Sequence, residues 1–295
     1  MIIPTTLQIE PVNGICTARC TMCAFPTWTR KPHRMSMKDY TVILERFMPY
    51  REHLQYLSLQ GFGESLLDSQ IAEKVREAKR LGFKGIGFAT NCTELNAETS
   101  TKLLDAGIDT LICSIDGITK ESHEAIRIGT NYEEIVDNVL NFIDVRNLYH
   151  YDAKVIIRFI RQKANAHEWE EFKAYWEAQL RPSDAVVSFD IVDCDSKVKD
   201  FADKDVSDGA DVPCECDQLY QRIIVLSNGN IVLCCADDND VFSLGSVLAT
   251  DPIEIYNNAT FTYHREMMRL GKVNLLHLCK TCTIPRSQKL KDKVT

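Results

Sequence analysis

Short β-rich runs alternate with amphipathic helical stretches over residues 5–192, and this alternation most constrains the fold. A helical crossover returns each strand parallel to the last, so the pattern predicts βα units around a parallel sheet. The predicted strands span residues 6–10, 54–60, 84–90, 110–115, 154–160 and 185–191. The predicted helices span residues 37–48, 69–81, 97–106, 132–146 and 166–179. Six units predict an α/β fold, a partial (β/α)6 TIM barrel, whose chemistry lies on loops after the strands.

The composition narrows the class of protein. The chain has 12 cysteines, and its start, MIIPTTLQIEP, has neither the basic nor the long apolar segment of a signal peptide. We therefore expect a cytoplasmic, reducing location, where clustered cysteines bind metals or carry redox chemistry more often than they form disulfides.

No apolar run is long enough for a membrane span. A formal net charge of −8 and a pI of about 5.4 argue against nucleic acid as a partner, so we expect a small molecule or a short peptide as substrate.

Three cysteines follow the first predicted strand within eight residues: Cys16, Cys20 and Cys23. A cubane cluster is normally held by four thiolates, so three on one loop would hold a [4Fe–4S] cluster and leave one iron open to another ligand. Their spacing differs from ferredoxin runs and from paired zinc motifs. A zinc site or a chance grouping is the alternative. Because the loop follows a strand directly, we expect it at the mouth of the barrel.

This spacing resembles the signature of the radical S-adenosylmethionine (SAM) superfamily, in which the fourth iron chelates the amino and carboxylate groups of SAM. The resemblance implies that Cys16, Cys20 and Cys23 hold the SAM-binding [4Fe–4S] cluster. It also implies a flavodoxin-type or ferredoxin-type reductant. The chemistry implied is reductive cleavage of SAM to a 5′-deoxyadenosyl radical, which abstracts a hydrogen atom from a substrate C–H bond.

The second predicted strand runs into Gly-Phe-Gly-Glu at residues 61–64, which resembles the GGE motif of the same superfamily. Glycines allow backbone groups to approach a ligand closely, and Glu64 adds an acceptor for an ammonium group. The resemblance implies that Gly61, Gly63 and Glu64 bind SAM, although an ordinary strand-to-helix turn also tolerates two glycines. Met22 stands where the family usually has an aromatic residue against adenine, and a thioether makes a similar contact.

Further positions at strand ends resemble SAM-contacting residues. Asn91 lies in Thr-Asn-Cys, where relatives usually show Thr-Asn-Gly. Ser114 and Asp116 stand at the end of the fourth predicted strand, where the barrel opens. We expect Ser114 near the SAM ribose or carboxylate, with Asp116 equally placed to cap the next helix. Arg127 lies in Ala-Ile-Arg-Ile-Gly, which resembles a segment of SPASM and twitch enzymes; a structural salt bridge is the alternative.

Arg158 stands in the middle of the fifth predicted strand among apolar neighbours. A buried guanidinium needs a partner. It either pairs structurally or faces the barrel lumen, where it would clamp the SAM carboxylate or a polar substrate. We expect the second arrangement.

After an acidic linker at residues 193–212, the pattern changes to a hairpin over residues 221–235 with an Asn228-Gly229 turn, the strongest short hairpin signal. Four cysteines surround it, with spacings x17, x44 and x2: Cys216, Cys234, Cys279 and Cys282. The arrangement resembles the SPASM/twitch extension, particularly that of twitch-type aminocyclitol dehydrogenases acting on 2-deoxy-scyllo-inosamine. It implies one auxiliary [4Fe–4S] cluster. A zinc ribbon is the alternative, and Cys214 or Cys235 stands close enough in sequence to replace a ligand.

We therefore expect a radical SAM core over residues 1–192, a linker over 193–212 and an auxiliary-cluster domain over 213–295. The predicted activity is oxidation of a carbohydrate or aminocyclitol, with Arg158 or Lys197 near the substrate and the auxiliary cluster as electron acceptor.

Three alternative functions stay open. In an epimerase, a thiol that binds no iron, Cys235, Cys92 or Cys194, would return a hydrogen atom to the substrate. A peptide-modifying enzyme of the sulfatase-maturation kind is disfavoured because the sequence shows no N-terminal leader-binding domain. A non-catalytic iron–sulfur electron carrier would not need the SAM-contacting residues.

Overall fold

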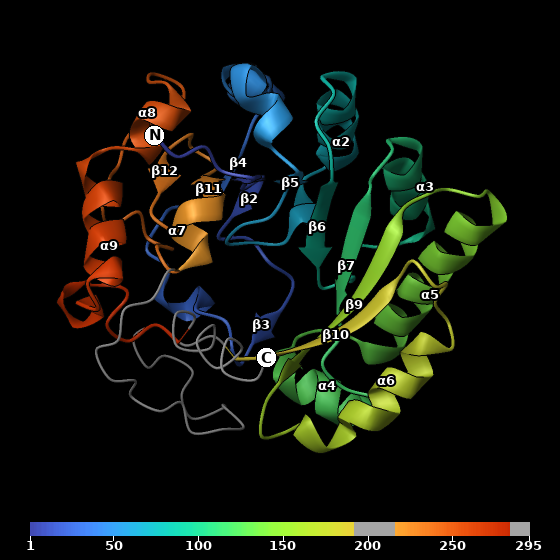
Figure 1. The fold of residues 1–295 in the computed structure, drawn as a ribbon. Coiled ribbons are helices and arrows are strands. Elements are labelled where there is room, and N and C mark those ends of the chain that lie inside the picture. Colours follow the sequence, from blue (N-terminus) through green and yellow to red (C-terminus); the bar gives the residue numbers. More distant parts are fainter. Residues whose placement is uncertain (192–215, 284–295) are drawn as a thin grey trace.

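A computed structural model of the 295-residue chain describes residues 1–191 and 216–283 (Figure 1). The predicted linker at 193–212 lies outside the described residues, as do Cys194, Lys197 and Cys214. The expected division into domains therefore stays a prediction.

One eight-stranded sheet forms the centre of the molecule, in the order β10-β9-β7-β6-β5-β1-β11-β12. Six of its strands come from the first 191 residues and run parallel to one another. They are β1 (Thr6–Ile9), β5 (Tyr56–Ser58), β6 (Ile86–Thr90), β7 (Thr110–Ser114), β9 (Lys154–Arg161) and β10 (Ala185–Asp190). The predicted α/β fold with six parallel strands is confirmed. Within the described residues the sheet ends at β10 and β12, as expected of a partial barrel.

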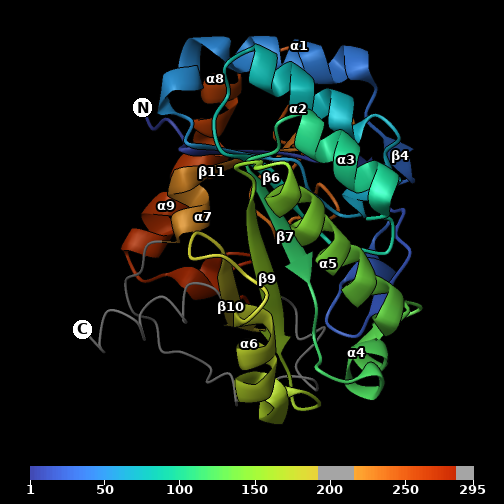
Figure 2. The same ribbon diagram turned by 90° about the vertical axis from the view of Figure 1, so that its right-hand side faces the viewer.

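The crossover helices lie near their predicted positions, and Figure 2 shows the first four side by side along one face. They are α1 (Met37–Phe47), α2 (Ile71–Arg80), α3 (Ala97–Asp105), α5 (Tyr132–Leu148) and α6 (Trp169–Glu177). Polar caps fix their starts: the Ser36 hydroxyl accepts from the Asp39 amide at 3.0 Å, and Asn96 caps α3 in the same way. The helix predicted from residue 166 begins later than expected. Asn165 donates to the Ile160 carbonyl instead of capping a helix, so Ala166–Glu168 form a 3-10 turn.

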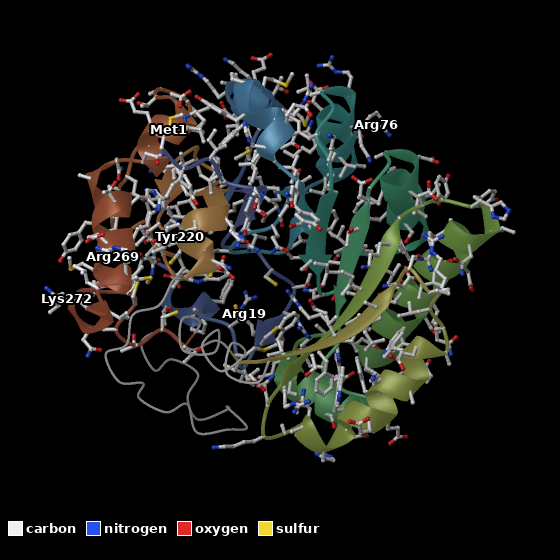
Figure 3. All side chains as sticks on the ribbon, in the orientation of Figure 1. Met1, Arg19, Arg76, Tyr220, Arg269 and Lys272 are labelled. Atoms are coloured by element: carbon white, nitrogen blue, oxygen red, sulfur yellow. The ribbon has the colours of Figure 1, made fainter. Side chains whose placement is uncertain are left out.

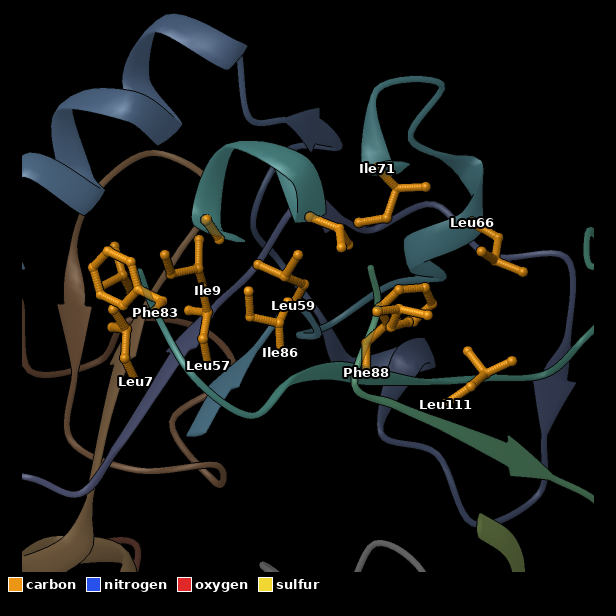
Figure 4. Close-up of a cluster of buried hydrophobic side chains, with 14 of the residues drawn as sticks. Leu7, Ile9, Leu57, Leu59, Leu66, Ile71, Phe83, Ile86, Phe88 and Leu111 are labelled. Atoms are coloured by element: carbon orange, nitrogen blue, oxygen red, sulfur yellow. The ribbon is translucent and has the colours of Figure 1, made fainter. Parts of the chain in front are cut away.

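The core fills the space between the sheet and these helices (Figure 4). Leu7 and Ile9 of β1, Leu57 of β5, and Ile86 and Phe88 of β6 are at most 1% exposed. They stand at alternate strand positions and so share one face of the sheet. Complete burial of each such side chain contributes roughly 1.5–3 kcal/mol to the free energy of folding. The well-packed strands therefore hold the loops at their ends in place.

The C-terminal segment adds two strands to this same sheet. β11 (Arg222–Val225) pairs in parallel with β1, and β12 (Ile231–Val232) pairs antiparallel with β11. The predicted hairpin is therefore present, with Gly229 in its turn at φ +86°. Its first strand starts later than expected because α7 (Asp217–Gln221) precedes it. Two further helices, α8 (Pro252–Tyr256) and α9 (Ala259–Arg269), lie beside the hairpin (Figure 1).

Two small sheets hold the loops after β1. β2 (Val12–Asn13) pairs with β4 (His33–Arg34), and β3 (Arg19–Cys20) pairs with β8 (Arg127–Ile128), which follows α4 (Lys120–Ile126). Strands of two residues have no periodicity that a sequence could reveal. Among the helices of residues 1–191 and 216–283, none has the length and hydrophobicity of a membrane span.

Candidate functional site

A cavity of about 490 Å³ lies at the carboxyl ends of the parallel strands. Its wall is formed by the loops after β1 and β5, the ends of β6, β7 and β9, and the segment after β12. The structure brings together here the three cysteines of the first loop and most residues predicted to contact SAM or substrate. These residues are Cys16, Cys20, Met22, Cys23, Gly61, Gly63, Glu64, Asn91, Ser114, Arg127, Arg158 and Cys235. Lys197 and Cys194 lie outside the described residues, and Cys92 is buried outside the cavity wall.

N–H groups face the sulfurs of the first loop. The Ala18 amide lies 3.4 Å from Cys16 Sγ, Asn91 Nδ2 lies 3.7 Å from the same sulfur, and Arg127 Nη1 lies 3.7 Å from Cys20 Sγ. Such donors stabilise a thiolate more than a thiol. Burial raises the pKa of Cys23 to about 11, and bound iron reverses this effect because a coordinating thiol is deprotonated. A three-thiol donor set with N–H groups around it fits an iron–sulfur cluster.

The two glycines of the loop after β5 are required by close contact with the loop after β1. A Cβ atom on Gly61 would lie 2.4 Å from Cγ of Glu10, and one on Gly63 would lie 2.6 Å from the carbonyl oxygen of Val12. Both distances are too short for any larger residue. The Gly-x-Gly pattern therefore packs the two loops together, in addition to lining the cavity.

Glu64 joins its own loop to the end of β6 from a buried position. Its carboxylate accepts from the Thr90 hydroxyl at 2.7 Å, the Asn91 amide at 2.9 Å and the Leu66 amide at 3.1 Å. Burial raises the pKa of Glu64, while these hydrogen bonds act in the opposite direction. A carboxylate has about four acceptor sites, so the side chain retains capacity for one more donor from the cavity.

Two arginines at the ends of the strands have different partners. Arg127 forms a buried ion pair with Asp116 at 2.7 Å. The expectation that Asp116 caps the next helix is therefore wrong: Thr119 caps α4, and Asp116 is drawn to the guanidinium. Arg158 instead donates to Ser114 Oγ at 2.7 Å and forms no ion pair within the described residues. Burial, reinforced by Arg127, lowers the pKa of Arg158 to about 10.

Two functional positions were missed by the sequence analysis. Gln162, just after β9, accepts from the Thr21 hydroxyl at 3.0 Å, and its Nε2 lies 3.7 Å from Sδ of Met22, so it holds Met22 in the cavity wall. Glu10, just after β1, is completely buried and accepts from the Phe62 amide at 3.0 Å. A polar residue directly after a buried strand was the available signal for both.

The four predicted auxiliary ligands come from three separated segments. Cys216, Cys279 and Cys282 are buried and Cys234 is half-buried. Burial raises the pKa of Cys216 to about 12 and that of Cys235 to about 11, and the Cys282 thiol adds to both shifts, which places these sulfurs near one another.

The spacing of these thiols bears on the zinc alternative. In residues 1–191 and 216–283, no three histidine, cysteine or acidic side chains stand close enough for a single metal ion. Ligands of a cubane bind different irons and stand farther apart than ligands of one zinc ion. Four thiolates can hold either a zinc ion or a cubane cluster, so the family comparison below distinguishes the two.

Comparison with protein families agrees with this geometry. Residues 11–158 match the model of the radical SAM superfamily. The chain belongs to this superfamily. Residues 208–283 match the SPASM iron–sulfur cluster-binding domain. The radical SAM domain implies a [4Fe–4S] cluster and SAM, and the SPASM domain implies auxiliary iron–sulfur clusters, in keeping with the two sets of cysteines.

Curated relatives of this radical SAM chain match it in part. A tungsten-containing aldehyde ferredoxin oxidoreductase cofactor-modifying protein of Pyrococcus furiosus is 31% identical over 105 residues, which cover 36% of this chain and 29% of that protein. A probable GTP 3′,8-cyclase of Methanothermobacter marburgensis is 28% identical over 166 residues, 52% of each chain. The chain thus spans about half or less of the length of these relatives.

Solved structures share the fold over nearly the whole chain. BtrN in complex with AdoMet and 2-DOIA superposes with a TM-score of 0.62 at 17% identity, covering 95% of this chain and 93% of BtrN. Native anSMEcpe with bound AdoMet superposes with a TM-score of 0.68 at 16% identity, covering 95% of this chain and 89% of that one. At these identities the likeness establishes the radical SAM fold.

Proposed function

We propose that this radical SAM enzyme is an oxidoreductase that converts a carbohydrate or aminocyclitol alcohol to a ketone. The observation that carries the proposal is the cavity itself. It joins the three cysteines of the first loop, the Arg158 guanidinium, which has no carboxylate partner in the described residues, and Cys235 of the C-terminal segment. The fold shared with BtrN, whose complex contains 2-DOIA, supports the substrate class.

The chain's own residues have distinct parts in this reaction. When bound, the cluster and SAM supply a 5′-deoxyadenosyl radical that takes a hydrogen atom from the substrate, and the auxiliary cluster takes one electron. Cys16, Cys20 and Cys23 leave one coordination corner free. Arg158 holds the substrate oxygen by a charge-assisted hydrogen bond and stabilises it as its proton leaves to solvent. Loss of one hydrogen atom, one electron and one proton turns a secondary alcohol into a ketone.

Other cavity residues orient SAM in this proposal. Glu64 accepts from the amino group with its remaining acceptor site. Ser114 donates to the carboxylate or ribose, and Met22 contacts the adenine. Arg127 acts on the cluster loop through its contact with Cys20 Sγ.

Epimerisation is the second candidate, because one spare thiol lines the cavity. Cys235 would return a hydrogen atom from the opposite face, and the resulting thiyl radical would then take one electron from the reductant and one proton from solvent. Cys92 does not suit this role: it is 0% exposed, lies outside the cavity wall and has a left-handed backbone with φ of +65°.

Peptide oxidation is the third candidate, since one solved structure of anSMEcpe contains the Cp18Cys peptide.

Isotope transfer tests the proposal. The reduced holoenzyme is incubated anaerobically with SAM and a panel of deuterated sugars and aminocyclitols, and 5′-deoxyadenosine and product are analysed by mass spectrometry. We expect deuterium in 5′-deoxyadenosine and a product lighter by two hydrogens. Solvent deuterium at one carbon with no change of oxidation level would select the epimerase, and transfer only from labelled peptides would select a peptide substrate. An electron carrier would not bind SAM at all in an equilibrium titration.

A further inference from the structure

Residues 11–38, which surround the first cysteine loop, are basic in an acidic chain. They contain five lysines and arginines and no aspartate or glutamate, whereas the formal net charge of the whole chain is −8. The rest of the chain therefore carries 13 more acidic than basic side chains. The basic residues of this segment are Arg19, Arg30, Lys31, Arg34 and Lys38, and His33 stands among them.

Four of these side chains form an exposed strip, defined here as Lys31, His33, Arg34 and Lys38. None of the four forms an ion pair within the described residues, and Arg34 only donates to the Leu67 carbonyl. The strip covers β4 and the start of α1. Figure 2 shows β4 at the right-hand edge of the molecule, far from α6 and α9.

The strip lies close to the cysteine loop. In the small β2–β4 sheet, His33 stands opposite Asn13, and the Asn13 side-chain amide donates to the Lys31 carbonyl at 2.8 Å. Asn13 precedes Cys16 by three residues, a chain length that spans at most about 11 Å. The strip is therefore joined to the predicted cluster ligands by one strand pair and a short chain segment. Arg19 stands between two of these ligands but donates to the Cys16 and Ala18 carbonyls.

Arg30 fixes this segment in place without contributing free charge. Its guanidinium donates two hydrogen bonds to the buried Glu10 carboxylate, at 2.7 and 2.9 Å, and its Nε donates to the Asp238 carbonyl at 2.7 Å. Glu10 neutralises the charge of Arg30, and the hydrogen bonds to Glu10 and Asp238 fix the position of the segment. The exposed cations beside Arg30 therefore have a defined position relative to the cavity.

We propose that this basic strip docks an acidic one-electron protein carrier of the flavodoxin or ferredoxin kind, which reduces the cluster held by the first loop. The proposal rests on the proposed function, since SAM cleavage needs one electron. That electron passes from the carrier to the cluster, the carrier is oxidised, and no bond changes in the docking partner. An acidic carrier is repelled by most of this acidic surface and attracted to the strip, which both speeds the encounter and orients it.

Charge reversal tests the docking surface in the holoenzyme. The variant Lys31→Glu/Lys38→Glu changes two exposed side chains outside the cavity wall, and a carboxylate at position 38 suits the first turn of α1. The matched control, Arg76→Glu/Lys272→Glu, makes the same charge change at two outer positions labelled in Figure 3. Binding of purified flavodoxin is measured at low ionic strength, and SAM cleavage is driven either by reduced flavodoxin or by reduced methyl viologen, a small cation.

We expect the strip variant to weaken flavodoxin binding by about tenfold or more and to slow flavodoxin-driven cleavage below saturation, with cleavage by methyl viologen unchanged. The control variant should retain wild-type binding. Added salt should weaken wild-type binding and reduce the difference between wild type and strip variant. Unchanged flavodoxin affinity in the strip variant would overturn the proposal, as would an equal loss with methyl viologen, which would assign the strip to the site itself. If wild-type enzyme fails to cleave SAM with methyl viologen, the proposed function fails while the binding measurement still stands.

Discussion

Glu10 and Arg30 form a two-point ion pair, with nitrogen–oxygen distances of 2.7 and 2.9 Å, where the loops at the sheet's mouth meet. The same carboxylate accepts from the Phe62 amide at 3.0 Å and the Ser227 amide at 2.8 Å. One buried side chain thus joins the cysteine loop, the glycine loop and the turn that follows β11 in the SPASM region. Its hydrogen bonds to charged and backbone donors satisfy the carboxylate, which is why a charge is tolerated at 0% exposure.

Removing Arg30 should therefore leave an uncompensated buried charge. We expect Arg30→Ala to lower the free energy of unfolding by about 3–5 kcal/mol, measured by anaerobic urea unfolding. The double variant Arg30→Ala/Glu10→Gln should recover part of the loss because the stranded charge is gone. A loss below 1 kcal/mol in the single variant would mean that water compensates Glu10.

Replacing Cys16, Cys20 and Cys23 together by alanine should remove the SAM-binding cluster and abolish 5′-deoxyadenosine formation. Iron per chain should fall by half, from about eight atoms if the chain holds two four-iron clusters. Iron analysis and product assay check both points. A triple variant that still forms 5′-deoxyadenosine would show that the loop is not the active centre.

Glu64→Gln should weaken SAM binding by about tenfold or more, since a charge-assisted hydrogen bond contributes roughly 1.5–3 kcal/mol. Thr90→Val is the matched control, because it removes a donor to Glu64 but leaves the carboxylate in the cavity. Equilibrium titration with SAM compares the two. Equal weakening in both variants would assign Glu64 to loop structure alone.

Changing Cys279 and Cys282 to alanine should stop product formation while uncoupled SAM cleavage partly continues, if the auxiliary cluster accepts the substrate electron. Cys235→Ser should then retain most turnover. If the enzyme is an epimerase, we expect the opposite result for Cys235→Ser. Hydrogen abstraction would continue in this variant, but solvent deuterium would no longer enter the product. Product analysis in deuterated buffer distinguishes the two reactions.

Burial lowers the pKa of His123 to about 3, and the Asp116 amide donates to its Nδ1 at 3.3 Å, so the ring is neutral in the fold. Between about pH 3 and the unfolded value near 6.5, the unfolded chain binds a proton that the folded chain does not. The His123 contribution to stability is therefore complete above pH 6.5 and falls on acidification by up to about 1.4 kcal/mol per pH unit. His123→Asn, which keeps an acceptor for the Asp116 amide, should show a shallower pH dependence of unfolding between pH 5 and 7. Parallel curves for the two proteins would contradict the assignment.

Much of this fold could be predicted from the sequence because each strand and helix has its own local periodicity. Pairing has no such signal: nothing near Thr6 indicates that its neighbour in the sheet is Arg222. The same limit applies to the site. The family resemblance indicated that Ser114 faces the cavity, but the Arg127 partner of Asp116 becomes visible only when α4 is folded. Cysteine spacing indicated candidate ligands, whereas Gln162 and Glu10 have their contacts with residues of distant segments.

The parallel pairing of β1 with β11 has a consequence for synthesis of the chain. β1 is made well before β11, so one of its two edges stays without this partner until residue 225 has been made. An unpaired edge is a template for wrong pairing, and contacts this distant in sequence form slowly. The nascent protein thus carries an exposed β-edge beside its cysteine loop until the SPASM region is translated, so the interval in which it is most prone to aggregate is set by the length of its own radical SAM core.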